Sequence, residues 1–360
     1  MQASSTQPRA PEREAFYGRI GAHHLAPLWE SLHALVTRQP VSPCVPAQWR
    51  YDEVRPYLME AGALISAEEA ERRVLILENP GLPGQAAVTH SLYAGLQLIL
   101  PGETAPAHRH TQSALRFVLE GHGAYTAVDG ERTSMAPGDF VITPSWTWHD
   151  HGNESQEPMV WLDGLDIPLL RLLDASFAEP GPAARQMISK PAGDSLARFG
   201  HNLLPVDWTP GEVKTSPVFN YPYARTREAL ATLARHGAPD PCHGHKLRYS
   251  NPASGDFAMP TIGAFMQLLP GSGFATAPYR SSDGTVYVVV EGAGETRVGA
   301  DRVFRWQPRD VFVVPSWTWH EHRPTGGGGG GAAAAAVLFS FSDRPVQQKL
   351  GLWREERSRA

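Results

Sequence analysis

Three histidines have the spacing of a metal site: His108 and His110, one residue apart, and His149, about forty residues later. Successive side chains of a β-strand point to opposite faces, so His108 and His110 would present two imidazoles on one face. A third imidazole from a second strand would complete a set that suits a first-row transition metal and leaves coordination positions open. We therefore expect these three residues to bind one metal ion.

The residues around these histidines resemble the two sequence motifs of the cupin superfamily. The shared positions are Gly102, His108, His110, Gly121, Gly138, Pro144, His149 and Asn153. Most cupins have a glutamate where this chain has Ala114, so the site resembles a variant with three histidines and no carboxylate. Within the cupins, the stretches PAHRHTQSALRFVLEG and GDFVITPSWTWHDHGN resemble gentisate 1,2-dioxygenases and the related salicylate and 1-hydroxy-2-naphthoate dioxygenases.

The elements that must position these residues have the pattern of short strands. From residue 91 to residue 168, apolar and polar residues alternate between turns such as Asp129-Gly130, which is a strong hairpin signal. This pattern indicates an antiparallel β-barrel of the jelly-roll type. Trp146 and Trp148, on the turn before His149, are expected to pack against neighbours and not to take part in the chemistry.

The barrel pattern then repeats. PSWTWHEH at 315–322 matches PSWTWHDH at 144–151 after a shift of 171 residues, and a repeat of this length predicts two stacked barrels. The predicted fold is therefore an all-β bicupin, with the second barrel at 256–343. In this second copy Tyr279 and Ser281 stand where His108 and His110 should be, and only His320 remains, so we expect it to hold no metal.

The rest of the chain is expected to be largely helical. The predicted parts are a helical arm at 1–90, a connector with helices at 169–255 and a C-terminal tail with a helix at 344–360. The segment 326–336 reads GGGGGGAAAAA, and because glycines carry no side chain to pack, we expect it to be a flexible loop.

Composition narrows the class of protein. The chain has 360 residues, 42% hydrophobic and 19% charged, and a net charge of -5, which favours a soluble enzyme over a nucleic-acid-binding protein. The two cysteines, Cys44 and Cys242, fit no disulfide or metal pattern. Because the N-terminus is polar and no apolar run approaches a membrane span, a cytoplasmic protein without membrane contact is expected.

Three neutral imidazoles would leave both positive charges of a divalent ion uncompensated. An anionic aromatic acid with an ortho hydroxyl would bind well, because its carboxylate and phenolate oxygens form one chelate ring. Fe(II) held by three facial ligands keeps three further positions, two for that chelate and one for O2. The expected partners are therefore a small aromatic ortho-hydroxy acid and O2.

The alternation of strand residues suggests which side chains face the substrate. Arg116 would share the face of His108 and His110 if the strand stays regular, and a substrate carboxylate would partner its charge. An internal salt bridge is the alternative partner. His151 has the parity of His149 and could take a proton from the substrate hydroxyl. The further candidates are Tyr93, Gly95, Gln97, Asp163 and either Arg72 or Arg73 of the arm.

The resemblance implies more than the spacing does. It implies one Fe(II) per subunit, a homotetramer, and opening of the gentisate ring to give maleylpyruvate. It also favours Arg116, His151, Gln97, Asp163 and Arg72 as residues on the substrate side. The alternatives that the sequence leaves open are salicylate or 1-hydroxy-2-naphthoate as substrate, a bicupin that binds a ligand without catalysis, and a sugar-phosphate isomerase, which Ala114 disfavours.

Overall fold

The computed structural model describes residues 10–209, 213–271, 273–325 and 334–358. The chain divides into two compact units, Met1–Val41 and Ser42–Ala360. In the first unit, α1 (Pro11–Gly21) and α2 (Leu28–Leu35) contain no buried residue. The second unit contains both barrels.

Eleven strands of the described chain form the first barrel, as a six-stranded sheet against a five-stranded one. The order in the larger sheet is β12 (Asn220–Tyr221), β8 (Phe140–Thr143), β5 (Ala114–Glu120), β10 (Met159–Leu165), β3 (Tyr93–Ile99) and β2 (Val74–Ile76). The order in the smaller sheet is β11 (Ala178–Pro180), β4 (Thr104–His110), β9 (His149–Asn153), β6 (Ala124–Val128) and β7 (Glu131–Ser134). The interior between the sheets is filled by one apolar cluster that includes Val118, Val141 and Trp161.

The second barrel repeats this plan. Its larger sheet has the order β1 (Ala47–Trp49), β19 (Val311–Val314), β16 (Thr285–Glu291), β21 (Ala336–Ser342), β14 (Gly263–Leu269) and β13 (His245–Arg248). Its smaller sheet has the order β18 (Arg302–Trp306), β17 (Gly294–Val298), β20 (His320–Pro324), β15 (Tyr279–Ser281) and β22 (Glu355–Arg357). The fold is a bicupin with an all-β core, as the sequence repeat predicts.

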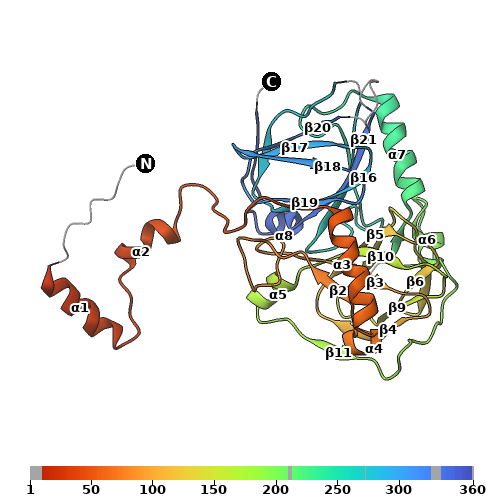
Figure 1. The fold of residues 1–360 in the computed structure, drawn as a ribbon, viewed down its shortest axis with the longest axis horizontal. Helices are drawn as coiled ribbons and strands as arrows, with labels where there is room; N and C mark the ends of the chain where they lie inside the picture. The colour runs from red at the N-terminus through yellow and green to blue at the C-terminus, as the bar shows by residue number, and fades with distance from the viewer. Residues whose placement is uncertain (1–9, 210–212, 272, 326–333, 359–360) are drawn as a thin grey trace. The chain divides into compact units, whose positions relative to one another are not determined.

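The two larger sheets pack against each other through their outer faces, so the barrels lie one above the other in Figure 1. Phe117 of β5 stacks on Phe339 of β21 with ring centroids 4.1 Å apart and an interplanar angle of 10°. The cluster at this junction continues into Leu115, Val286 and Phe341. This shared core joins the barrels into one unit, because each sheet hides an apolar face that solvent would otherwise contact.

Helices cover the edges of the second unit. They are α3 (Tyr51–Leu64), α4 (Ala67–Ala70), α5 (Ile167–Leu172), α6 (Asp194–Phe199), α7 (Tyr223–His236) and α8 (Arg344–Lys349). Figure 1 shows α7 running along the side of the second barrel. Ser66 caps α4, because its Oγ accepts a hydrogen bond from the backbone N–H of Glu69 at 3.1 Å. No helix in the described part of the chain is long and apolar enough to cross a membrane.

Turn residues fix the strands as expected. Asp129 and Gly130 both have positive φ, 48° and 76°, and join β6 to β7 in a two-residue hairpin. Gly121 after β5 has a φ of 91°, and a Cβ there would lie 2.4 Å from the carbonyl oxygen of Pro158, so only glycine fits. The same reasoning explains why a glycine stands at this point of the cupin motif.

Several parts of the structure differ from, or fall outside, the sequence-based expectation. The barrels also take strands from the expected helical arm and connector, because β1 and β2 lie within 1–90 and β11, β12 and β13 within 169–255. Residues 111–113 break the strand, so β4 and β5 lie in different sheets and not on one regular strand. The C-terminal helix ends at Lys349, and the next ordered element is β22, which pairs with β15. Gly351, with a φ of 71°, provides the left-handed turn that ends the helix. The flexible loop expected at 326–336 lies largely outside the described residues.

Candidate metal centre and substrate site

Two paired strands of the first barrel bring the three histidines together. β4 carries His108 and His110 on one face, and the register of β4 with β9 places His108 directly opposite His149. One ring nitrogen from each histidine lies within 4.8 Å of those of the other two, and the described residues contain no other such group of His, Cys, Asp or Glu. The sequence prediction of a histidine triad is therefore confirmed as geometry.

Hydrogen bonds fix the tautomer of two of these rings. Nδ1 of His110 lies 2.9 Å from the carbonyl oxygen of Gln112, and Nδ1 of His149 lies 2.9 Å from that of Thr147. A carbonyl can only accept, so each Nδ1 carries the proton and each Nε2 keeps its lone pair. His149 Nε2 is buried and has no partner among the described residues. This donor set fits a metal ion.

The environment keeps the imidazoles neutral, as metal ligands must be. Burial, together with the nearby charges of Arg72 and Arg116, lowers the pKa of His108 to about 2 and that of His110 to about 4. Burial likewise places the pKa of His149 well below its ordinary value. At neutral pH all three lone pairs are available to a cation, without competition from protons.

Arg72, in the loop between α4 and β2, is the arginine that reaches the histidines. Its guanidinium contacts Nδ1 of His108, lies 2.9 Å from Nε2 of the same ring and donates to the carbonyl oxygen of Pro106 at 3.0 Å. Arg73 points the other way and forms a bidentate ion pair with Glu103, with both contacts at 2.8 Å. The sequence alone left this choice open.

Arg116 lies inside the first barrel, although on the sheet that faces the histidine strands. It is 4% exposed, its Nη1 donates to Thr143 Oγ1 at 2.7 Å, and its Nε lies 3.6 Å from Asp163 Oδ1. Nε itself has no hydrogen-bond partner among the described residues. The internal salt bridge considered from the sequence is thus present, but it is long and leaves part of the guanidinium unused.

Asp163 lies opposite Arg116 where β10 pairs with β5, and like Arg116 it is buried. Its Oδ1 accepts a hydrogen bond from Trp161 Nε1 at 2.9 Å. Burial raises the pKa of Asp163 to about 6, although the charge of Arg116 opposes this shift. The carboxyl group therefore titrates close to neutrality, which is typical of functional sites.

His151 lies next to His149 on β9, with ring centroids 5.6 Å apart. Thr126 Oγ1 lies 3.0 Å from His151 Nδ1 and 3.3 Å from Met135 Sδ, so it holds the ring by a hydrogen bond. Nε2 of His151 is buried and has no partner among the described residues. Such a nitrogen can accept a proton from a bound hydroxyl group.

β3 contributes the remaining predicted positions. Gln97 is buried opposite Trp161, and Gly95 lies in the same ladder row as Asp163 and Arg116. A Cβ on Gly95 would lie 2.4 Å from Val74 Cγ1 and 2.7 Å from the Tyr93 hydroxyl, so a side chain would not fit there. Tyr93, Gly95 and Gln97 therefore share the inner face of β3, as the alternation predicts.

Sequence reasoning missed the residues that orient these groups, namely Thr126, Thr143 and Trp161. The alternation of β10 could have indicated Trp161, which has the parity of Asp163 two residues later. Thr143 lies opposite Ala114 where β8 pairs with β5, and its hydroxyl reaches Arg116, two residues further along β5. This contact can be predicted only when the register of β5 and β8 is known. No signal in the sequence identifies Thr126 as the partner of His151.

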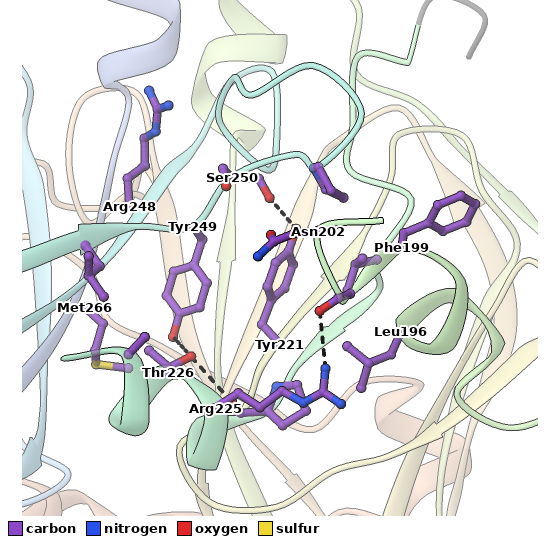
Figure 2. Close-up of a pocket in the computed structure, with 16 residues that line it drawn as sticks. Leu196, Phe199, Asn202, Tyr221, Arg225, Thr226, Arg248, Tyr249, Ser250 and Met266 are labelled. Carbon is purple, nitrogen blue, oxygen red and sulfur yellow. Dashed lines mark hydrogen bonds between the residues drawn. The ribbon is translucent and has the colours of Figure 1, made fainter. Parts of the chain in front are cut away.

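A separate pocket of about 250 Å³ lies between the connector and the second barrel (Figure 2). Tyr249 donates to Thr226 at 3.2 Å, Arg225 to the carbonyl of Gly200 at 3.3 Å, and Tyr221 to the carbonyl of Ser250 at 2.9 Å. The hydroxyl groups of Tyr221, Thr226 and Tyr249 are thus already hydrogen-bonded. None of the predicted site residues lines it.

Comparison with known proteins agrees with this geometry. Residues 95–165 match the cupin domain family. Over 347 residues the chain is 58% identical to gentisate 1,2 dioxygenase 1 of Aquipseudomonas alcaligenes, covering 96% of this chain and 97% of that protein. It is 38% identical over 348 residues to a 5-aminosalicylate 1,2-dioxygenase of a Comamonas species, covering 95% and 90%.

A solved structure gives the same result for the fold. The salicylate 1,2-dioxygenase of Pseudoaminobacter salicylatoxidans, crystallised as an adduct with gentisate, superposes with a TM-score of 0.90 at 32% identity, covering 100% of this chain and 98% of that one. The similarity therefore extends over both barrels and is not confined to the histidine motifs.

Proposed function

Because the chain belongs to the gentisate 1,2-dioxygenase family of ring-cleaving cupin enzymes, we propose that it opens gentisate to maleylpyruvate with Fe(II) and O2. The observation that supports this most is the set of three neutral imidazoles facing a buried arginine across the barrel. Fe(II) would be held by His108, His110 and His149. When bound, it would supply the Lewis acidity and the redox chemistry that ring cleavage requires.

The protein's own part is to bind and orient the aromatic acid. We assign the substrate carboxylate to Arg116, whose unpartnered Nε and long contact to Asp163 leave it able to form a charge-assisted hydrogen bond. Gln97, Tyr93 and Gly95 would line the space for the ring, and the absence of a side chain at Gly95 lets Val74 and Tyr93 pack closely beside it.

His151 is the proposed proton acceptor. Its Nε2 is buried beside His149, and the ring is held by Thr126, so it is oriented before a substrate arrives. Burial places the pKa of His151 well below its ordinary value, so the ring is neutral until the negative charge of a bound acid raises its basicity. Asp163 would balance part of the positive charge of Arg116.

Arg72 would change partner when the site fills. In the structure it lies on the ligand side of His108, where a divalent cation would repel it. We propose that Arg72 turns from His108 to the anionic substrate, which would give the acid a second cationic contact.

Assembly and location follow from the same proposal. We propose that the chain acts as a homotetramer in the cytoplasm, with metal chemistry confined to barrel 1 at 91–168. In this division the arm at 1–90, the connector at 169–255 and the tail at 344–360 hold the subunits and barrels in place, and the barrel at 256–343 has no metal site.

Oxygen uptake by the reconstituted protein tests the reaction. The protein would be loaded with Fe(II) without oxygen, mixed separately with gentisate, salicylate and 1-hydroxy-2-naphthoate, and exposed to air. We expect the fastest uptake with gentisate, together with one maleylpyruvate formed per O2 consumed. Faster turnover of salicylate or 1-hydroxy-2-naphthoate would identify that acid as the substrate. No uptake with any of the three acids would refute the dioxygenase proposal.

A further inference from the structure

The interior of the second barrel contains polar groups that the metal chemistry does not use. The core inside this barrel includes Tyr287 and Leu338, which identifies the inner face of its larger sheet. Pairing places Ser340 opposite Tyr287, and Gln267 opposite Leu338, so both polar residues lie on that inner face. Lys246 of β13 is opposite Gln267 and joins the same face.

Two of these polar side chains lack any hydrogen bond. Gln267 is 1% exposed, and neither its amide oxygen nor its amide nitrogen has a partner among the described residues. Ser340 is fully buried, and its hydroxyl also has no partner there. Buried polar groups are normally satisfied by protein, water or a ligand, because leaving them unpaired costs free energy. Their position therefore suggests a missing polar molecule.

Lys246 supplies an unpaired positive charge at the same place. Its Nζ lies 4.9 Å from the Phe265 ring centroid and 5.9 Å from that of Tyr287, but forms no hydrogen bond or ion pair with any described residue. Burial and the charge of Arg344 lower its pKa to about 8, although the charges of Asp283 and Asp240 oppose this shift. The residue as a whole is only partly buried.

Comparison of the two barrels shows why the charge is unpaired. In the first barrel, the equivalent ladder row contains Arg116 opposite Asp163, an internal pair of opposite charges. In the second barrel, this row contains Tyr287 opposite Ser340, so the carboxylate is gone. The cation of the second barrel, Lys246, instead lies on the edge strand β13 opposite Gln267. The equivalent pair of the first barrel is Val74 opposite Gln97.

The charged groups nearest to Lys246 are already engaged. Asp283 accepts a hydrogen bond from Trp353 Nε1 at 2.9 Å. Arg344 donates to the Tyr279 hydroxyl at 3.1 Å and lies 3.8 Å from Glu355. Asp240 is paired with Arg357 at 2.8 Å. An anion from solution is therefore the partner that this face lacks.

We propose that the second barrel binds a small organic carboxylate without a metal ion, with Lys246 pairing with the carboxylate and Gln267 and Ser340 hydrogen-bonding to its polar atoms. Two sources have this chemistry: an aromatic hydroxy acid, or a non-aromatic dicarboxylate such as a ring-opened product. The proposal does not depend on the reaction of the first barrel, because it uses none of its residues.

Calorimetric titration of the full-length, metal-free protein tests the site, with salicylate and maleate as separate probes. The background variant is Arg116→Met, which removes the cation of the first barrel. In this background we expect one carboxylate bound per chain, weakened about tenfold or more by Lys246→Met. Lys246→Arg should retain most of the affinity, since it keeps the charge. Lys349→Met, at a partly exposed lysine of α8, serves as the matched control and should bind as the background does.

The outcomes separate the sources. Binding of salicylate alone would identify the aromatic acid, binding of maleate alone would identify the dicarboxylate, and binding of both would identify a general carboxylate site. The proposal is overturned if neither probe binds in the Arg116→Met background, or if Lys246→Met binds as tightly as that background. Near-ultraviolet circular dichroism of each variant would show that its barrels are folded.

Discussion

At the scale of single residues, the two barrels offer a matched pair of histidines. His149 and His320 occupy equivalent places in the repeat, but only His149 has two further imidazoles beside it. His320 Nε2 lies 3.2 Å from the Tyr287 hydroxyl, so its lone pair is already used within the protein.

His108→Ala should therefore abolish retention of Fe(II), and His320→Ala should leave it unchanged. One imidazole fewer leaves two ligands, too few to hold the ion against water. Metal content after gel filtration measures this, and circular dichroism checks the fold. If His320→Ala were the variant that lost iron, the assignment of the barrels would be reversed.

Arg116 is predicted to contribute strongly to substrate affinity. Arg116→Ala should weaken binding of the aromatic acid by on the order of 2–5 kcal/mol, because the carboxylate would lose a desolvated cationic partner. The loss is expected mainly in KM, measured by oxygen uptake at several gentisate concentrations. An unchanged KM would mean that Arg116 serves only the internal pair with Asp163.

Asp163 gives the activity a predicted dependence on pH. Burial raises its pKa to about 6, so the carboxylate is charged above that pH and protonated below it. As pH falls through about 6, Asp163 loses the charge that holds the Arg116 guanidinium in position, and kcat/KM should decrease. The histidine ligands do not produce this limb, because their pKa values are lowered. In Asp163→Asn the decrease near pH 6 should disappear from the profile of the remaining activity; a limb that persists would belong to another group.

At the scale of elements, one arginine connects the two halves of the histidine triad. Arg109 lies between His108 and His110 on β4, and its guanidinium stacks 4.5 Å from the Trp146 ring and 4.7 Å from the Trp148 ring, on the turn before His149. It also forms an ion pair with Glu179 of β11. Trp146 and Trp148 thus pack as expected, and they hold the strand of two ligands to the turn that leads to the third.

The second barrel has the same arrangement of one arginine beside two tryptophans, but it lacks the three histidines. Arg280 lies 4.5 Å from Trp317 and 4.7 Å from Trp319, and pairs with Glu356 of β22. Arg109→Met and Arg280→Met should therefore each cost about 1 kcal/mol of stability. Only Arg109→Met should also lower the affinity for Fe(II), by about tenfold. Chemical denaturation and metal titration of both variants measure this, and equal effects on metal affinity would contradict it.

At the scale of the whole molecule, the N-terminal unit has apolar side chains that it does not bury. Leu25, Trp29, Leu35 and Val36 are 60%, 60%, 69% and 70% exposed, and neither α1 nor α2 contains a buried residue. Exposed apolar surface of this kind is usually covered by another protein surface. Under the homotetramer proposal, a neighbouring subunit would cover it.

Deleting residues 1–41 should consequently lower the assembly state and leave the barrels folded, because residues 42–360 pack as a unit of their own. Sedimentation velocity would measure the assembly state, and circular dichroism the fold. A deletion variant that remains a tetramer would show that the barrels alone form the interface.

The sequence by itself determined the bicupin, the grouping of the three histidines and the inner faces of most strands. These follow from local rules: a two-residue period, glycines at turns with positive φ, and a repeat of 171 residues that preserves the turn and its tryptophans. The parity that places Gln97 and Gly95 inside the barrel is also local. Such features need no knowledge of which strands pair.

The tertiary structure decided what depends on strand register and on contacts between distant segments. Only the strand pairing places Asp163 beside Arg116 and Ser340 beside Tyr287. These partners lie 47 and 53 residues apart, and the alternation of apolar and polar residues does not show which residues of two strands lie opposite each other. Only the fold shows that Arg72 reaches His108 whereas Arg73 pairs with Glu103. The strand break at 111–113 could not be predicted for the same reason. The chain crosses from one sheet to the other there because the barrel must close, and no local signal in the sequence marks that point.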